Sequence, residues 1–317
     1  MDNNPRAKVL LTGATGFIGG AVLARLLSED CPVAVAVRRV NALPGSKAIK
    51  IVVPDFGDLP ALLDGYDVVI HAAARAHIMH ESIEDPLSEY RRVNVEGTLN
   101  LARRAVAAGV KRFIFISSIK VNGECTAEGR AFAANAEPAP EDIYGLSKLE
   151  AEQGLLSLVT EAGMEIVVIR PPIVYGPGVK GNFASIIKLL EKGFPLPLGA
   201  IHNKRSLVGI DNLVDLIVRC IDHPAAANQV FLAGDGEDLS TTELLRGVGE
   251  AMGKPARLIP VPAGLLQFGA TLLGKKALAQ RLLGSLQVDI SKTCELLDWK
   301  PPYTVQEGLR RCFERSN

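Results

Sequence analysis

Residues 8–19 read KVLLTGATGFIG, and this stretch decides the fold. Lys8–Thr12 is a short apolar run, as expected of a strand buried on both faces of a parallel sheet. Three glycines follow in the pattern G-x-x-G-x-x-G: Gly13 permits a tight turn, Gly16 permits close approach of a phosphate, and Gly19 permits close packing of helix on strand. A strand, a glycine loop and a helix in this order predict dinucleotide binding at the helix N-terminus. We expect contacts from Gly13, Thr15, Gly16, Phe17, Ile18 and Gly19.

Outward from this loop, short apolar runs alternate with helical patterns, which is typical of βαβ units. Further strands are expected at Val33–Val37, Ile51–Val53, Asp67–His71, Arg112–Ser117 and Glu165–Arg170, and helices at Phe17–Ser28, Leu87–Ala108 and Tyr144–Ala162. The fold class is therefore α/β, with a doubly wound parallel (Rossmann) sheet. After residue 170 Gly and Pro cluster and the rhythm becomes irregular. We expect a dinucleotide-binding domain over 1–170 and a smaller substrate-binding domain over 171–317, with the chain returning to the first domain around 203–235.

Composition excludes several classes of protein. The 317 residues contain 35 Lys plus Arg and 35 Asp plus Glu, so the chain lacks the surplus of basic residues that is typical of nucleic-acid-binding proteins. No apolar run is long enough to span a membrane, and because Gly and Thr interrupt the first apolar stretch we expect no signal peptide. Five widely spaced cysteines suggest neither disulfides nor a metal site, so a cytoplasmic location is expected. The apolar segment 263–283 leaves two interpretations open: a membrane-surface helix, or the favoured one, a helix that covers the substrate or the core.

The residues after the second strand bear on the choice of dinucleotide. NAD enzymes usually place a carboxylate there, about 20 residues after the glycine loop, to bind the ribose 2′-hydroxyl. This chain has Arg38 and Arg39 instead, and a guanidinium suits the 2′-phosphate of NADP. The sequence therefore favours NADPH. Asp55 and Phe56, after the third strand, are expected beside the adenine.

The segment Tyr144-Gly-Leu-Ser-Lys148 places a phenol and an ammonium at i and i+4 on one helix face. A chance surface pair is the alternative interpretation. An ammonium beside a phenol favours the phenolate and brings its pKa toward the working range. Ser118, at the end of a strand, can donate a hydrogen bond to a carbonyl oxygen on which negative charge develops.

With these motifs in order, the chain resembles the extended short-chain dehydrogenase/reductases over nearly its whole length. The resemblance rests on TGATGFIG (12–19), HAAA (71–74), VNVEGTLNL (93–101), ISSIKVNG (116–123), YGLSK (144–148) and RPPIVYGPG (170–178). It implies that Ser118, Tyr144 and Lys148 are catalytic and that Lys148 also binds the nicotinamide ribose. It further implies that Asn94 supports the active-site helix, whereas His71 packs at its strand end. Further cofactor contacts are implied for Ala72, Ala73, Ala74, Asn94, Ser117, Tyr144, Pro171 and Ile173.

The family includes epimerases, dehydratases and reductases that act mostly on nucleotide sugars. Dehydratases carry an Asp-Glu pair where this chain has Ile119 and Lys120, so we set dehydration aside. Segments such as SSIKVNGE (117–124) and GSLQVDISKT (284–293) resemble bacterial reductases that convert a UDP-4-keto-6-deoxy-N-acetylhexosamine to UDP-N-acetylquinovosamine for surface polysaccharides. NADPH-dependent 4-keto reduction is therefore the expected activity. The alternatives are a UDP-hexose 4-epimerase with tightly bound NAD and a non-catalytic NADP-binding sensor.

The resemblance also implies a pocket for the UDP-sugar. Arg205 corresponds to an arginine that binds the diphosphate, and Arg281 is a second candidate for that role. Relatives often dimerise through the helix that carries Tyr144 and the helix before it, so a homodimer is expected. The full set of expected substrate residues is Arg75, His77, Ser118, Lys120, Val121, Asn122, Asn182, Phe183, Leu196, Leu198, Arg205 and Arg281.

Overall fold

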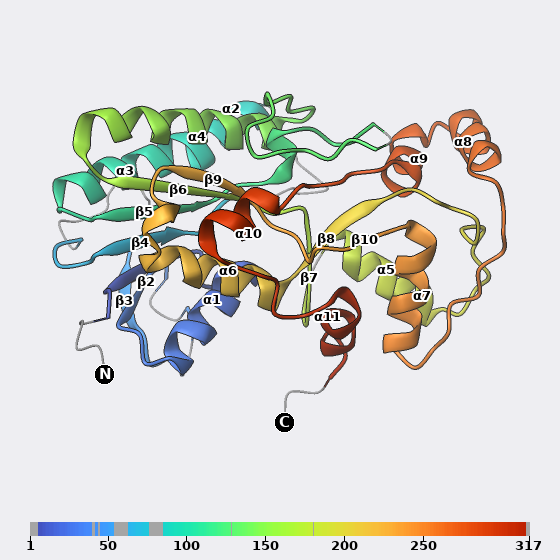
Figure 1. Ribbon diagram of the computed structural model, residues 1–317, viewed down its shortest axis with the longest axis horizontal. Coiled ribbons are helices and arrows are strands. Elements are labelled where there is room, and N and C mark those ends of the chain that lie inside the picture. The colour runs from blue at the N-terminus through green and yellow to red at the C-terminus, as the bar shows by residue number, and fades with distance from the viewer. Residues whose placement is uncertain are drawn as a thin grey trace.

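A computed structural model describes residues 6–39, 42–43, 45–53, 63–75, 85–127, 129–179 and 181–314. Helices cover a central sheet at one end of the molecule, and a smaller group of strands and helices forms the other end (Figure 1). The elements are β1 (Val9–Thr12), α1 (Phe17–Ser28), β2 (Val33–Val37), β3 (Ile49–Val52), β4 (Val68–His71), α2 (Pro86–Tyr90), α3 (Gly97–Ala107), β5 (Arg112–Ile116), α4 (Ile143–Ala162), β6 (Glu165–Arg170), β7 (Ile173–Tyr175), α5 (Asn182–Glu191), β8 (Arg205–Gly209), α6 (Ile210–Asp222), β9 (Gln229–Leu232), β10 (Asp238–Leu239), α7 (Thr241–Ala251), α8 (Ala263–Leu272), α9 (Lys276–Leu283), α10 (Ser291–Leu297) and α11 (Val305–Arg311).

The larger sheet has seven parallel strands in the order β3-β2-β1-β4-β5-β6-β9. The chain winds outward from β1 to β3 and then crosses back to β4, so the strand order reverses between β1 and β4. In doubly wound sheets, ligands bind at this switch point, beyond the carboxyl ends of the strands. The predicted α/β fold is confirmed. β3 begins two residues earlier than the sequence predicted, at Ile49.

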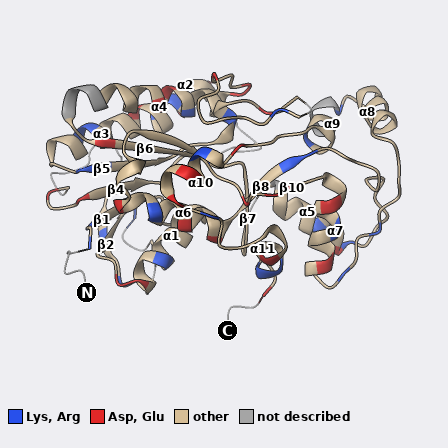
Figure 2. Cartoon of the chain, viewed as in Figure 1, with Lys and Arg blue, Asp and Glu red and all other residues tan. Residues whose placement is uncertain are grey.

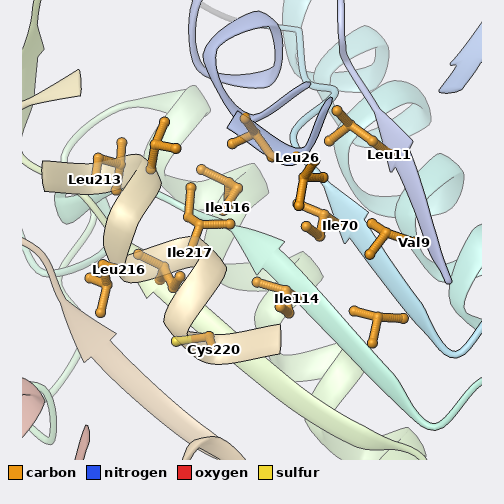
Figure 3. Packing of buried hydrophobic residues seen from close by; sticks show 14 of the residues in the cluster. Val9, Leu11, Leu26, Ile70, Ile114, Ile116, Leu213, Leu216, Ile217 and Cys220 are labelled. Carbon is orange, nitrogen blue, oxygen red and sulfur yellow. The ribbon is translucent and has the colours of Figure 1, made fainter. Parts of the chain in front are cut away.

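The strands are apolar at successive positions because helices cover both faces of the sheet. Val9 and Leu11 of β1 point to the face covered by α1 and α6, where they join Leu26 and Leu213 (Figure 3). Leu10, between them, points to the opposite face and joins the core beneath α3 and α4. This two-sided burial fixes the positions of the strand ends that carry the candidate site.

The helical region predicted as Leu87–Ala108 has three parts. α2 leads into a π-helical segment, Arg91–Glu96, and α3 follows without a break. Asn94 lies in the π segment and is buried. π segments within helices are often found at functional sites, and here the segment carries one of the expected site residues.

The rest of the chain contributes to both ends of the molecule. β7, β8 and β10 form a three-stranded sheet packed against α5, α7 and α11, whereas β9 joins the larger sheet beside β6. The division into two domains near residue 170 remains our proposal. The segment 263–283 is not one helix: α8 ends at Leu272, and Gly274 has a φ of +67° before α9 begins. Among the described residues, no helix has the length and apolar character needed to cross a membrane.

Candidate functional site

The glycine loop adopts a conformation that needs glycine at two positions. Gly13 has a φ of +75°, and a Cβ added there would lie 2.5 Å from the backbone nitrogen of Ala73. A Cβ on Gly19 would overlap the carbonyl oxygen of Gly13. α1 begins after Gly16 with no side-chain cap, so its first N–H groups face the loop without an intrahelical acceptor. This is a suitable environment for a phosphate.

A cavity of about 1000 Å³ opens beyond the carboxyl ends of β1, β2 and β4, at the switch point of the sheet. Its lining includes nine of the expected site residues: Gly13, Thr15, Gly16, Arg38, Arg39, Ala72, Ala73, Ala74 and Arg75. It also includes residues that the sequence did not single out for this role: Ala36, Val37, Ala42, His71, Glu89, Arg92, Val93 and Gly97. Among the described residues, Phe17, Ile18, Gly19, Asn94, Ser117, Pro171 and Ile173 do not line it.

The cavity carries an excess of positive charge. Arg38, Arg39, Arg75 and Arg92 line it, and Glu89 is the one acidic residue in the described lining. Glu89 forms ion pairs with Arg92 and Arg75, and hydrogen bonds from Arg92 lower the pKa of its carboxyl group. The glycine loop, the free helix N-terminus and the arginines together fit the phosphates of NAD(P).

His71 supports the floor of this cavity. Thr98 donates its hydroxyl proton to the Asn94 carbonyl at 2.7 Å, so His71 Nε2 must donate to Thr98 Oγ1, at 3.0 Å. His71 Nδ1 then accepts from Thr12 Oγ1 at 2.7 Å, and the same Thr12 oxygen accepts from the Ala73 N–H. Burial lowers the pKa of His71 to about 3, so the ring is neutral at pH 7. These contacts fix the His71 ring at the end of β4, where it also lines the cavity, and its packing role remains a prediction.

Asn94 links the cavity to the helix that carries the expected catalytic pair. Its Oδ1 accepts from the Arg75 N–H at 2.8 Å, and its Nδ2 donates to the Arg75 carbonyl at 3.1 Å. The same Nδ2 also donates to Ser147 Oγ of α4 at 3.0 Å. Asn94 therefore holds the strand-end loop and α4 in one arrangement, which agrees with the supporting role expected of it.

Ser118, Tyr144 and Lys148 surround the carboxyl end of β5, the strand next to β4. Ser118 caps a 3₁₀ turn, Ile119–Val121, that packs against the start of α4, where Tyr144 is the second residue. Lys148, one helical turn further on, donates from Nζ to the carbonyl of Ile116 at 2.8 Å. The fold thus brings the expected trio to one place. In the described structure the three residues stand beside the cavity and are not part of its lining.

The electrostatics of this trio differ from the sequence-based expectation. Burial, with smaller contributions from Asp142 and Tyr90, raises the pKa of Tyr144, whereas we expected Lys148 to lower it. The reason is that the Lys148 ammonium contacts Ile116 and the Phe115 ring, with Nζ 4.3 Å from the ring centroid. Burial lowers the pKa of Lys148 itself to about 7.

A buried ion pair lies beneath the trio, and the sequence analysis missed it. Arg170 Nε donates to Glu152 at 3.0 and 3.2 Å, and its Nη1 donates to Asn122 Oδ1 at 3.0 Å. Glu152 also accepts from the Ser117 hydroxyl. Two signals were present in the sequence: Glu152 follows Lys148 by one helical turn, and Arg170 is a charged residue at the end of an apolar strand. Asn122, expected at the substrate, is instead buried in this group, and its Nδ2 has no hydrogen-bond partner in the described structure.

Lys120 takes part in a separate ion-pair cluster. Its Nζ lies 2.7 Å from Glu124 Oε1 and also pairs with Asp142, the residue that caps the N-terminus of α4. Burial acts to lower the pKa of Lys120, but the two carboxylates outweigh it and raise the pKa overall. Lys120 therefore holds the start of the helix that carries Tyr144, and a contact with the sugar or the diphosphate remains a prediction.

Five other expected substrate residues lie in the smaller part of the molecule: Phe183, Leu196, Leu198, Arg205 and Arg281. Arg205 Nη1 donates to the carbonyls of Arg281 and Gly284, both at 2.9 Å, so the two arginines expected at the diphosphate are neighbours. Four of the expected substrate residues are buried and do not line the described cavity: Val121, Phe183, Leu196 and Leu198. Outside the described structure lie Asp55, Phe56, His77 and the side chain of Asn182.

Comparison with known proteins establishes the family. Residues 9–234 match the NAD dependent epimerase/dehydratase family. The chain belongs to this family. The Vibrio cholerae protein named UDP-glucose 4-epimerase is 52% identical over 315 residues, which cover 98% of this chain and 95% of that protein. The match confirms the broader resemblance seen in the sequence, whereas the reductase subtype does not follow from it.

Similar solved structures support the fold. UDP-N-acetylglucosamine 4-epimerase from Bacillus cereus superposes with a TM-score of 0.75 at 20% identity, covering 96% of this chain and 98% of that one. UDP-glucose 4-epimerase from Thermotoga maritima superposes with a TM-score of 0.74 at 24% identity, covering 96% and 97%. At these identities the likeness establishes the shared fold alone.

Proposed function

We propose that this member of the family is a UDP-hexose 4-epimerase. The observation that carries the proposal is the meeting of Ser118, Tyr144 and Lys148 at the end of β5, beside a positively charged cavity that fits NAD(P). The name of the Vibrio cholerae relative, at 52% identity, supports UDP-glucose as the substrate class. Ile119 and Lys120, in place of a carboxylate pair, argue against dehydration.

In this proposal the protein's own groups move one proton at the sugar O4. A bound NAD(P), held by the glycine loop and the arginines of the cavity, would supply hydride transfer to and from the sugar C4. Tyr144, as the phenolate, takes the O4 proton as the C4 ketone forms and returns it as the hydroxyl is restored on the other face. Because burial raises the pKa of Tyr144, this step requires that the phenolate is stabilised once substrate is bound. Ser118 donates a hydrogen bond to the same oxygen, where it stabilises the developing charge. Over the cycle neither a proton nor a hydride is consumed.

Lys148 has a positioning and electrostatic role in this scheme. Its pKa of about 7 means that a small change in its surroundings changes its charge near neutral pH. In the structure the Lys148 ammonium is bound by the Ile116 carbonyl and does not lower the pKa of Tyr144. In this scheme a negative charge that forms on Tyr144 during turnover would favour the ammonium form of Lys148, which would then stabilise the phenolate.

A second candidate is NADPH-dependent 4-keto reduction of a UDP-4-keto-6-deoxy-N-acetylhexosamine, giving UDP-N-acetylquinovosamine or its C4 epimer for surface polysaccharides. The specific observation in its favour is that Arg38 and Arg39 both line the cavity at the end of β2. That position would carry a carboxylate in a typical NAD site. Reduction differs from epimerisation in its stoichiometry, because each turnover consumes one hydride from NADPH and one proton.

Two measurements on the purified protein distinguish these candidates. Mass spectrometry of the nucleotide released on denaturation identifies the dinucleotide that the protein retains, and stoichiometric NAD supports the epimerase. Incubation with UDP-glucose, followed by NMR of the sugar H4, detects UDP-galactose directly. Loss of NADPH absorbance with the 4-keto sugar, with NADH run alongside, detects the reductase. No epimerised product together with stoichiometric NADPH consumption would overturn the epimerase proposal.

The expected homodimer and cytoplasmic location are part of the same proposal. We propose that α3 and α4 form the contact between two copies, as in the family that the sequence resembles. Sedimentation equilibrium tests this directly, because a monomer at micromolar concentration would contradict it.

A further inference from the structure

α8 is a surface helix that is apolar on both of its sides. Ala263 and Leu266 pack inward against the core of the smaller part of the molecule. On the opposite side Leu265, Phe268 and Leu272 are 63%, 65% and 72% exposed, at the spacing i, i+3, i+7. A helix that is apolar all round is normally covered on both sides. The outward side of α8 therefore has the character of a contact surface.

Further exposed apolar side chains occur outside α8 in the same part of the molecule. Leu273 is 74% exposed, and Phe194 and Ile259 are also exposed, so we call these six residues, Phe194, Ile259, Leu265, Phe268, Leu272 and Leu273, the apolar end. They account for six of the eleven exposed large hydrophobic residues in the described structure. The segments that carry Phe194 and Ile259 run side by side, since the Leu196 N–H donates to the Arg257 carbonyl. α8 lies at one extreme of the long axis and carries no charged residue (Figures 1 and 2).

The sequence around the apolar end is basic, although the chain as a whole is neutral. Between Glu250 and Asp289 there is no acidic residue, and five basic residues occur: Lys254, Arg257, Lys275, Lys276 and Arg281. Such a segment is complementary to a negatively charged partner. Basic residues close to the cytoplasmic face of a membrane are attracted to its anionic lipids.

Two other partners fit the observations less well. In a two-fold contact between copies of this chain, the same patch would face itself and bring the basic segments together. A specific protein contact usually includes about one hydrogen bond per 100–200 Å², but α8 offers only Gln267 and Thr271, and Thr271 already donates to the Gln267 carbonyl. A lipid surface needs no directional partners and accommodates a protruding apolar end.

We propose that the apolar end docks on an anionic membrane surface, with α8 in the interfacial layer and Arg257 and Lys275, which flank the exposed apolar residues in the sequence, at the headgroups. The contact is peripheral, in keeping with the absence of a spanning helix from the described structure. It is independent of the proposed reaction, because it involves none of the residues at the cavity or at the end of β5.

Vesicle flotation tests this with the full-length protein. Wild type is mixed with phosphatidylcholine vesicles that contain about one third phosphatidylglycerol, and with pure phosphatidylcholine vesicles. We expect binding to the anionic vesicles, weaker binding to the neutral ones, and a clear loss of binding as salt rises from about 0.1 M to about 1 M. The double variant F268S/L272S should bind about tenfold more weakly or worse, because each side chain contributes its apolar burial. Ile49→Ser removes an equally exposed apolar side chain, 67% exposed on β3, and should bind like wild type.

A separate variant tests the contribution of the basic residues to vesicle binding. Lys275→Glu should weaken binding to anionic vesicles about fivefold or more, with little effect on neutral ones, whereas Arg103→Glu on α3 should have no effect. Circular dichroism and thermal melting establish that every variant is folded. Failure of wild type to float with any vesicle would overturn the proposal. So would a concentration-dependent dimer that F268S/L272S abolishes, since the apolar end would then be an interface between copies.

Discussion

Replacing Glu152 by glutamine tests whether the buried ion pair between Glu152 and Arg170 stabilises the folded protein. Glu152 is 1% exposed and Arg170 is 5% exposed, and the guanidinium directs Nε and Nη2 at the carboxylate. Glutamine keeps the shape and one acceptor oxygen but leaves the guanidinium without a counter-charge. Breaking a buried pair in this way costs about 3–5 kcal/mol, and the remaining acceptor places our expectation near the lower end, at about 3 kcal/mol.

The same helix supplies a matched control. Glu150 of α4 pairs with Arg91 through three hydrogen bonds, but both side chains reach solvent. Glu150→Gln should therefore cost no more than about 1 kcal/mol. The free energy of unfolding is measured by urea denaturation at pH 7, followed by far-UV circular dichroism. If the two variants lose the same stability, within about 0.5 kcal/mol, the reasoning is refuted.

The pH profile of turnover is a second measurement, and it separates the loss of the Glu152 charge from a loss of packing. Glu152 acts to raise the pKa of Lys148, against the larger effect of burial. Removing the charge should therefore move the pKa of Lys148 further below 7, and the pH profile of turnover should shift in the same direction. Replacing both partners, as in E152L/R170M, should cost less than the sum of the single changes, because no buried charge is left unpaired.

Four further predictions follow from the site and the loop. Tyr144→Phe should keep dinucleotide affinity, measured by fluorescence titration, and lose about 10²–10⁴-fold in turnover, so a near wild-type rate would exclude it as the proton-transferring group. Arg38→Ala should weaken NADPH binding by about tenfold or more and leave NADH binding unchanged, whereas equal losses would show that selection lies elsewhere. The folded pKa of His71, about 3, lies below its unfolded value of 6.5, so stability should fall by up to a few kcal/mol as pH drops from 6.5 toward 3, and His71→Asn should flatten that slope in urea unfolding. Gly19→Ala, whose Cβ would overlap a loop carbonyl, should abolish dinucleotide binding, whereas Gly269→Ala, where the Cβ meets open space, should be tolerated and raise Tm slightly.

The sequence predicted the parallel sheet and the glycine loop because those features are local. Strands buried on both faces are apolar throughout, and the residues around Gly13 sit directly between β1 and α1. The π segment that carries Asn94 was not predictable from periodicity, because its residues continue a helical pattern. The Glu152–Arg170 pair depends on contact between α4 and the end of β6, which the chain order does not reveal.

The direction of the Tyr144 pKa shift also could not be predicted from the sequence. The spacing of Tyr144 and Lys148 correctly places both on one helix face, but spacing does not say where an ammonium points. In the structure the carbonyl of Ile116 binds it, and burial then dominates both side chains. A local motif thus names the chemical groups, while the protonation states depend on the strand end against which the helix packs.

A continuous set of hydrogen bonds connects the two parts of the candidate site. From Asn94 it runs through Thr98, His71 and Thr12 to the Ala73 N–H at the cavity, and through Ser147 to the helix that carries Tyr144. Because His71 stays neutral, none of these groups changes charge near pH 7, so the distance between the glycine loop and α4 is set by uncharged contacts. Lys148, by contrast, has a pKa of about 7. Epimerase and reductase can share such a framework, and the difference between them must come from residues that contact the 2′-phosphate and the sugar.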